Sequence, residues 1–351
     1  MRSTTLAAGI LTLALAIYPA WRGIASAAAP AARQAGPMRP PGSAPPPPPP
    51  VQDQSQEIPR SQSTIKTQAT IVNIFATVRD GHHAVVNDLK KEDFKITEDG
   101  VDQPVSYFAR ESDLPITLGI LMDTSYSMYK ILGAEQDAAS RFVHEIMRKK
   151  DEALVMSFDT DVDLLADFTE DPRVLDQAIR RTQINVDASG IGGTAGTIPS
   201  QGGGTNLYDA IYLACHDQFP AETGRKAIVI LSDAEDTGSR ISLKDAIEAA
   251  QRSDAVIHVL LIRDFGATSG VGPSVARQMA DDTGGRVIDI RGEKSLDKAF
   301  DEITEELRFQ YVLGYYSSND KHDGTFRKIH VDVNRPDMKV LARRGYYAPR
   351  H

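Results

Sequence analysis

The sequence predicts a doubly wound, mainly parallel α/β sheet, with a flanking β-sandwich-like domain built from the N- and C-terminal segments. Between residues 113 and 308, short apolar segments alternate with segments of helical period. The segments "ITLGILMD", "AIVIL" and "AVIHVLLI" are almost wholly apolar, which is typical of parallel strands buried on both faces. The residues before and after this region alternate in the β manner, with no helical segment between them.

Residues 1–29 have the pattern of a secretory signal peptide. Arg2 precedes an apolar run from Leu6 to Ile17, and small residues at Ala25 and Ala27 mark a cleavage site. An uncleaved membrane anchor is the alternative, but the run is short against the roughly 20 apolar residues that a span needs. We therefore predict a secreted or periplasmic, cell-envelope protein without a transmembrane span after cleavage.

Residues 30–62 form a Pro-rich linker with an unbroken run from Pro45 to Pro50, which predicts an extended spacer. A ligand for an aromatic groove is the less favoured alternative. The β segment 63–112 contains "TQATIVNIFATVRD", "DFKITEDG" and "QPVSYFAR", from which we expect three or four strands.

The central region, 113–308, predicts strands and helices in alternation. Helices are expected at 131–148, 172–182, 206–219, 242–252, 273–282 and 295–307, with a Gly-rich loop at 189–204. The C-terminal β segment, 309–351, then offers three strands, "FQYVLGYYS", "FRKIHVDV" and "KVLARRGYY". Three strands make a poor core alone, so we expect the two terminal groups to complete one sandwich.

Composition excludes some functions. The chain of 351 residues has a net charge of −9, without the basic patch expected of a nucleic-acid-binding protein. Its one cysteine, Cys215, rules out an intramolecular disulfide and lies at helical spacing from Leu207 and Ile211. A buried core thiol is favoured over a nucleophile.

Oxygen-bearing side chains gather where two of the predicted strands end. Asp123 ends "ITLGILMD" and is followed by Ser125 and Ser127, while Asp233 ends "AIVILSD" and Thr205 stands at a loop-to-helix junction. We expect these side chains to converge, with Asp123 outside the apolar core, if the two strands are neighbours. An all-oxygen set favours a hard cation such as Mg²⁺, and the absence of His and Cys disfavours zinc.

In order and position, these five residues resemble the metal-ion-dependent adhesion site (MIDAS) of von Willebrand factor A domains. The resemblance covers about 113–308, and the flanking segments look like a bacterial exported subfamily. It implies that the hydroxyls contact a divalent cation (Mg²⁺, Mn²⁺ or Ca²⁺) and that the aspartates act directly or through water. A carboxylate from an unknown protein partner would fill the last position. Tyr126 and Ala234 stand where Gly is common in the family.

Two further readings compete with this adhesion or scaffold module. A strand that ends in Asp would also suit a Mg²⁺-dependent hydrolase or a phosphatase with an aspartate nucleophile. Such phosphatases, however, require a second Asp two residues after the nucleophile, where this chain has Ser125. No phosphate-binding loop with Lys and no Gly-x-Ser-x-Gly motif is present, so we predict no catalytic residues. The other alternative is a structural domain whose metal site is inactive.

Weaker motifs favour ordinary structural roles. Residues 159–170 resemble a calcium loop but have Leu164 where Gly is required, so a solvated hairpin turn is expected. His82 and His83 precede a turn and should be exposed. His258 lies in an apolar strand and should be a satisfied core residue.

Overall fold

The computed structural model describes residues 71–111, 114–185, 204–222, 224–263 and 271–350, all within one compact unit, Ile65–His351. The predicted signal peptide, the linker and nearly all of the Gly-rich loop lie outside the described residues. The predicted segment boundaries stay predictions.

A six-stranded sheet forms the centre of the described part, in the order β10-β9-β8-β5-β6-β7. Its strands are β5 (Ile116–Asp123), β6 (Glu152–Phe158), β7 (Val162–Thr169), β8 (Arg225–Ser232), β9 (Ala255–Ile262) and β10 (Val287–Ile290). All neighbours are parallel except β6 and β7, which form an antiparallel pair. The neighbours β5 and β8 lead into connections that leave in opposite directions across the sheet, so their shared edge is the switch point at which such sheets bind ligands.

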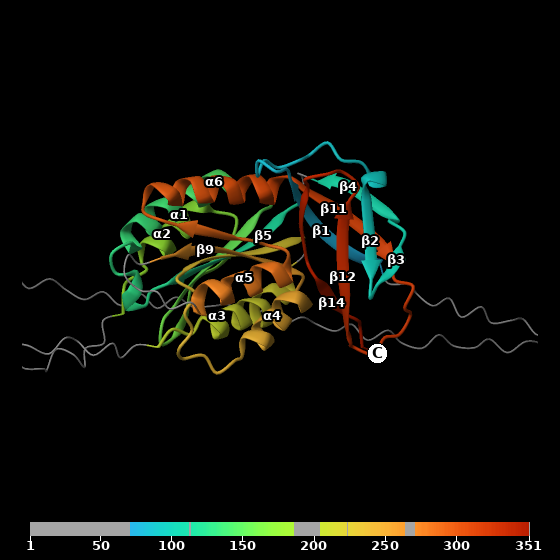
Figure 1. The fold of residues 1–351 in the computed structure, drawn as a ribbon. Coiled ribbons are helices and arrows are strands. Elements are labelled where there is room, and N and C mark those ends of the chain that lie inside the picture. Colours follow the sequence, from blue (N-terminus) through green and yellow to red (C-terminus); the bar gives the residue numbers. More distant parts are fainter. Residues whose placement is uncertain (1–70, 112–113, 186–203, 223, 264–270, 351) are drawn as a thin grey trace, which may run out of the picture. The chain divides into compact units, whose positions relative to one another are not determined.

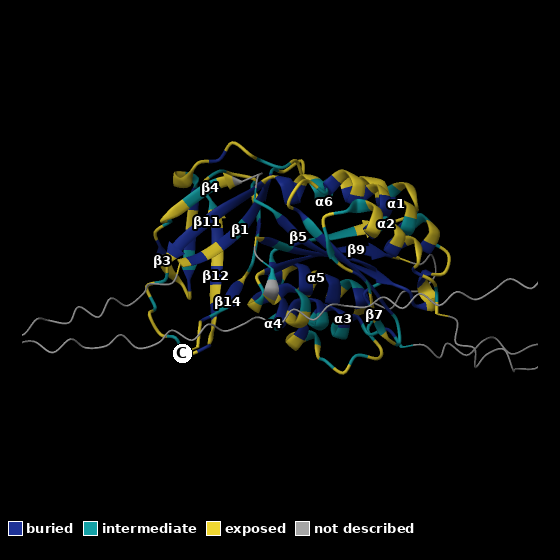
Figure 2. Cartoon of the chain, turned by 180° about the vertical axis from the view of Figure 1, so that it is seen from behind, coloured by how far each residue is buried: buried dark blue, intermediate teal, exposed yellow. Residues whose placement is uncertain are grey.

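Helices cover both faces of this sheet (Figure 1). One face packs against α1 (Leu132–Ile146), α2 (Pro172–Arg180) and α6 (Lys294–Arg308). The other packs against α3 (Leu207–Leu213), α4 (Leu243–Arg252) and α5 (Val271–Thr283). Successive residues of a strand point to opposite faces, so Ile120 and Leu121 of β5 enter two separate cores. Figure 2 shows the result, with buried strands between helices whose outer faces are exposed.

The helix predicted at 206–219 is present, but its geometry changes along its length. It is an α-helix at Leu207–Leu213, a π-helical turn at Ala214–Gln218 and a 3-10 turn at Phe219–Ala221. Cys215 lies in the π turn and is buried, as predicted, and burial raises the pKa of its thiol to about 12.

The two terminal segments together build the predicted flanking β sandwich. One sheet has the order β13-β1-β11-β4 and the other β14-β12-β2-β3. The strands are β1 (Ile71–Arg79), β2 (Phe94–Glu98), β3 (Val101–Gln103), β4 (Tyr107–Glu111), β11 (Gln310–Tyr316), β12 (Phe326–Val333), β13 (Lys339–Ala342) and β14 (Gly345–Tyr347). Both sheets mix strands from the two ends of the chain, and their inner residues, Ile74, Ile96, Tyr311 and Ile329 among them, share one core.

The single strand predicted from "KVLARRGYY" is wrong. The segment divides into β13, which pairs with β1, and β14, which pairs with β12 in the other sheet. Arg344 lies between them and forms ion pairs with Asp281 (2.9 Å) and Asp282 (3.3 Å) of α5. Arg344 thus lies against α5 at the point where the chain crosses from one sheet to the other.

Buried charges join the sandwich to the α/β region. Glu306 of α6 lies 3.1 Å from Arg79 Nε of β1 and 2.7 Å from Arg286 Nε, neither of them in hydrogen-bonding orientation. Burial raises the pKa of Glu306 to about 7, although both arginines oppose the shift.

His258 lies in the same buried cluster, 3.6 Å from Glu306. Burial and the arginines lower its pKa to about 3, so the ring is neutral and this contact is not an ion pair. The ring is buried as predicted, but neither ring nitrogen has a hydrogen-bond partner among the described residues, so the expectation of a satisfied core residue is wrong. His82 and His83 are exposed, as predicted.

Candidate metal centre

Asp123 ends β5 and is fully buried, although its strand-end position had suggested a place outside the core. Its carboxylate accepts a hydrogen bond from the Ser125 backbone N–H at 2.9 Å and one from the Ser232 hydroxyl at 2.5 Å. Burial raises the pKa of Asp123 to about 7, the charge of Asp233 adds to the rise, and the two hydrogen bonds oppose it. The groups that act on this carboxylate thus include another acid and no cationic side chain.

The two predicted serine ligands lie together in the turn after β5. Ser125 Oγ and Ser127 Oγ are 3.0 Å apart across the 3-10 turn Tyr126–Met128. Ser125 is buried beside Asp123, whereas Ser127 is exposed. The pair therefore places one hydroxyl oxygen inside the protein and one at its surface.

Thr205 is held against the loop that follows Asp233. Its backbone N–H donates to Thr237 Oγ1 at 2.9 Å, and its carbonyl accepts from the N–H groups of Thr237 (3.0 Å) and Gly238 (3.2 Å). Thr205 is buried, and Asp233 is partly buried. These bonds bring the loop before α3 to the same edge of the sheet as the loop after β8.

Asp159 connects the remaining loops at this edge, a role that the sequence did not reveal. Its carboxylate accepts from the Thr124 hydroxyl at 2.7 Å and from Asn185 Nδ2 at 3.2 Å, and its carbonyl accepts from the Asn206 N–H at 2.8 Å. The expected hairpin turn is confirmed, because β6 and β7 are antiparallel. Asp159 directly follows β6, so the strand-end argument used for Asp123 would have singled it out.

Glu135 is the acidic residue near the site that the sequence analysis missed. It lies in the first turn of α1, is fully buried, and neither carboxylate oxygen has a hydrogen-bond partner in the described part of the chain. Burial raises its pKa, and the charges of Asp123 and Asp233 add to the shift. A signal was available, because Glu135 stands on the apolar face of α1 between Leu132 and Ala139.

The backbone around Asp233 is closely packed. Ala234 has a positive φ of 59° and is buried, so the Gly common at this position in the family is replaced by a residue in a left-handed conformation. Gly272 of α5 lies against this turn, and a Cβ on it would collide with the carbonyl oxygen of Asp233. The position of Asp233 thus depends on a helix that contributes no predicted ligand.

The donor set fits a hard divalent cation and depends on hydroxyl oxygens. Among the described residues, no group of three or more His, Cys, Asp or Glu side chains is arranged to hold a metal ion. What the structure provides is a buried carboxylate without a cationic partner, next to a pair of hydroxyls. A cation would compensate that carboxylate, while the neutral hydroxyls would complete its coordination.

Two tyrosines border the serine turn. Tyr126 and Tyr129 expose 56% and 65% of their surface and stack with ring centroids 6.0 Å apart. Exposed aromatic pairs of this kind are frequent at protein–protein contacts.

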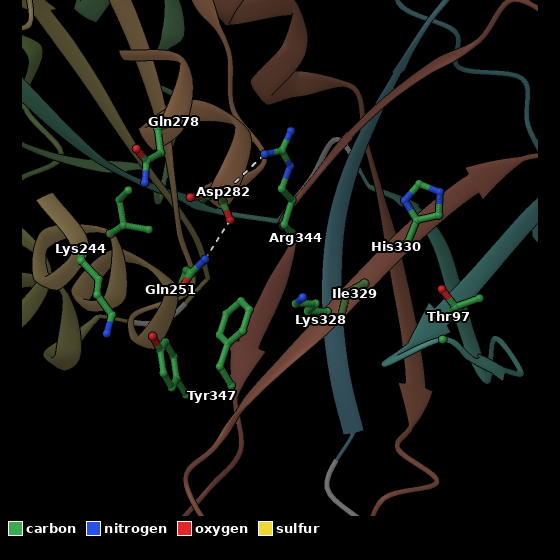
Figure 3. A pocket seen from close by; sticks show the side chains of 13 residues that line it. Thr97, Lys244, Gln251, Gln278, Asp282, Lys328, Ile329, His330, Arg344 and Tyr347 are labelled. Atoms are coloured by element: carbon green, nitrogen blue, oxygen red, sulfur yellow. Dashed lines mark hydrogen bonds and ion pairs between the residues drawn. The ribbon is translucent and has the colours of Figure 1, made fainter. Parts of the chain in front are cut away.

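A cavity of about 510 Å³ lies elsewhere, between α4, α5 and the strands β12 and β14 (Figure 3). Lys244 and Lys328 line it, together with Tyr347 and an ion pair between Arg344 and Asp282. None of the five predicted ligands lines this cavity, so it is separate from the candidate metal centre.

Residues 118–235 match the family model of the von Willebrand factor type A domain, a segment that begins within β5 and ends beyond Asp233. This part of the chain is a von Willebrand factor A domain. The recognition made from the motif residues is confirmed, and with it the α/β fold class. A search of curated proteins found no match.

Solved structures of similar fold include several A-domain proteins. A von Willebrand factor type A protein from Catenulispora acidiphila is 11% identical, with 81% of this chain and 75% of that chain aligned and a TM-score of 0.46. The von Willebrand factor domain of the type V pili tip protein Mfa5 from Porphyromonas gingivalis is 15% identical, with 55% and 94% aligned and a TM-score of 0.42.

A third structure is proximal thread matrix protein 1 from the mussel byssus, described as having a zinc-occupied MIDAS motif. It is 12% identical, with 60% of this chain and 49% of that chain aligned and a TM-score of 0.46. This chain thus spans about half the length of the mussel protein. In the part of the chain that the structure describes, no helix is both long and apolar enough to cross a membrane.

Proposed function

We propose that the A domain of this exported protein holds a divalent cation at Asp123, Ser125, Ser127, Thr205 and Asp233, and that this cation coordinates an acidic residue of a partner protein. The family match supports a metal-dependent protein-binding module in general. The observation that carries the finer proposal is the buried Asp123 carboxylate beside a hydroxyl pair, with no cationic side chain among the groups acting on it.

The donor chemistry supports a carboxylate as the incoming ligand. Ser125, Ser127 and Thr205 supply neutral oxygens, which leave more of the positive charge of the ion available for a further ligand than carboxylates would. Mg²⁺ is the first candidate because it prefers oxygen ligands and retains open positions for water or a partner; Mn²⁺ and Ca²⁺ are the others. A phosphate ligand is disfavoured because the loop lacks the Lys of a phosphate-binding motif.

The exposed tyrosines supply contact area at the mouth of the site. Tyr126 and Tyr129 flank Ser127, the exposed hydroxyl of the pair. A partner that places a carboxylate on the ion would cover both rings, and stacked aromatic rings lose little side-chain entropy on binding. We therefore assign binding to this edge and propose no catalytic role for it.

Partner capture tests the proposal. Wild-type protein is immobilised and tested with Mg²⁺ and with chelator, and the variants Asp123→Ala and Thr205→Ala are tested with Mg²⁺. We expect wild type to retain a partner in Mg²⁺ and to release it in chelator. Asp123→Ala should abolish this binding and Thr205→Ala should weaken it, while both variants stay folded. A retained partner that is indifferent to chelator would exclude the metal site as the contact, and hydrolysis of phosphate monoesters with Mg²⁺ would favour the hydrolase reading.

A further inference from the structure

We propose that Glu135 is a third carboxylate of the metal centre, which strengthens cation binding through its charge rather than as a direct ligand. The inference rests on the proposed function and adds to it a residue outside the resemblance that identified the five ligands.

Glu135 differs from the other buried acids of the described chain. Five carboxylates there are buried: Glu98, Asp123, Glu135, Asp151 and Glu306. Each of the other four has a hydrogen-bond donor or a guanidinium beside it. Glu135 has neither, and an acidic side chain is almost never fully buried unless it is paired.

An acid in the first turn of a helix has an ordinary explanation, which is a favourable interaction with the helix dipole. That interaction does not require burial, and solvent-exposed acids provide it on many helices. Glu135 instead replaces an apolar residue on the core-facing side of α1, where its desolvation is costly. The dipole alone therefore does not account for its position.

The charged groups that act on Glu135 are Asp123 and Asp233, the two acids of the proposed site. Three acids near one another repel in the absence of a cation, and a divalent ion among them reverses the sign of the interaction. Because no three acidic side chains of the described residues are arranged to hold an ion by themselves, we place Glu135 outside the ligand set. At the effective dielectric constant of about 20 that describes charges in proteins, a nearby acid changes the affinity for a divalent ion by about 10–100-fold.

Neutralising Glu135 should weaken metal binding without destabilising the metal-free protein. In Glu135→Gln we expect the Kd for Mg²⁺ and for Mn²⁺ to rise by about 10–100-fold in isothermal titration calorimetry. In chelator, the same variant should melt at or above the temperature of wild type, because burial and the charges of Asp123 and Asp233 already favour the uncharged form of Glu135. Glu145→Gln is the control, because Glu145 is an exposed residue of the same helix. It should leave both quantities unchanged.

The outcomes separate this inference from the proposed function. If wild-type protein binds neither metal, the proposed function fails. If wild type binds metal and Glu135→Gln binds it within twofold, or if Glu135→Gln is less stable in chelator, Glu135 is a structural residue and the inference is wrong. Glu135→Met places an apolar side chain of similar volume on the same face and provides a second neutral variant should the amide not fold.

Discussion

Replacing Asp123 with Asn is the sharpest test of the metal centre. The amide keeps the size of the side chain and one oxygen that can accept from the Ser125 N–H, and its NH2 group can donate to the Ser232 hydroxyl oxygen in place of the bond that Asp123 accepts. It removes the charge that a cation would compensate. Burial and the charge of Asp233 both disfavour the ionised form, so in chelator at pH 8 we expect the free energy of unfolding to rise by about 1–3 kcal/mol.

The metal-dependent stability should disappear in the same variant. A ligand at 100 times its Kd stabilises the folded wild type by about 2.7 kcal/mol. For a folded region of this size, that corresponds to a rise in Tm of about 5–10 °C. We expect this rise on adding Mg²⁺ to wild type and none for Asp123→Asn.

Differential scanning fluorimetry with and without Mg²⁺ measures both effects, and calorimetry gives the Kd. Asp163→Asn is the matched control, because Asp163 is an exposed acid on β7 of the same sheet. It should keep the full Mg²⁺-dependent rise. An equal rise in wild type and Asp123→Asn would mean that the ion binds away from Asp123.

Three further predictions concern the surroundings of the site. Gly272→Ala should weaken Mg²⁺ binding measured by calorimetry, because the added Cβ collides with the carbonyl of Asp233; unchanged affinity would show that the loop adapts freely. Glu306 has its pKa raised from 4.5 to about 7, so its stabilising contribution is complete below pH 4.5 and is lost as the pH rises through about 7. In urea titrations across that window, the free energy of unfolding of wild type should therefore fall by about 3 kcal/mol relative to that of Glu306→Gln. Glu305→Gln, on the exposed side of α6, is the control, and its free energy of unfolding should change with pH as that of wild type does. A pH-independent difference between wild type and Glu306→Gln would mean that the arginines keep Glu306 ionised. Tyr126→Ala should leave Mg²⁺ binding and stability unchanged but lower the affinity for a captured partner by about tenfold in surface plasmon resonance, and equal affinity would place the contact elsewhere.

The amino-acid sequence alone specifies most of the strands and helices and the polar residues at the strand ends. Apolar runs such as "AVIHVLLI" specify strands buried on both faces, because no solvated face would tolerate them. Asp123 and Asp233 could be placed at one edge only on the condition that their strands are neighbours, because the carboxyl ends of neighbouring parallel strands meet there. Local periodicity gives the strands and their ends, whereas the structure supplies the pairing of β5 with β8.

Which groups lie around those residues depends on the tertiary structure. Several features of the site depend on residues that are far apart in the chain. These are the burial of Asp123, the hydrogen bonds by which Asp159 connects the loops, and the contact of Gly272 with Asp233. "KVLARRGYY" divides between two sheets for a similar reason, since its two halves pair with β1 and with β12, which lie in different sheets. Glu135 is the intermediate case. Its place on an apolar helix face is visible in the sequence, but its lack of a partner depends on every element that surrounds it, because desolvation and charge act through space rather than along the chain.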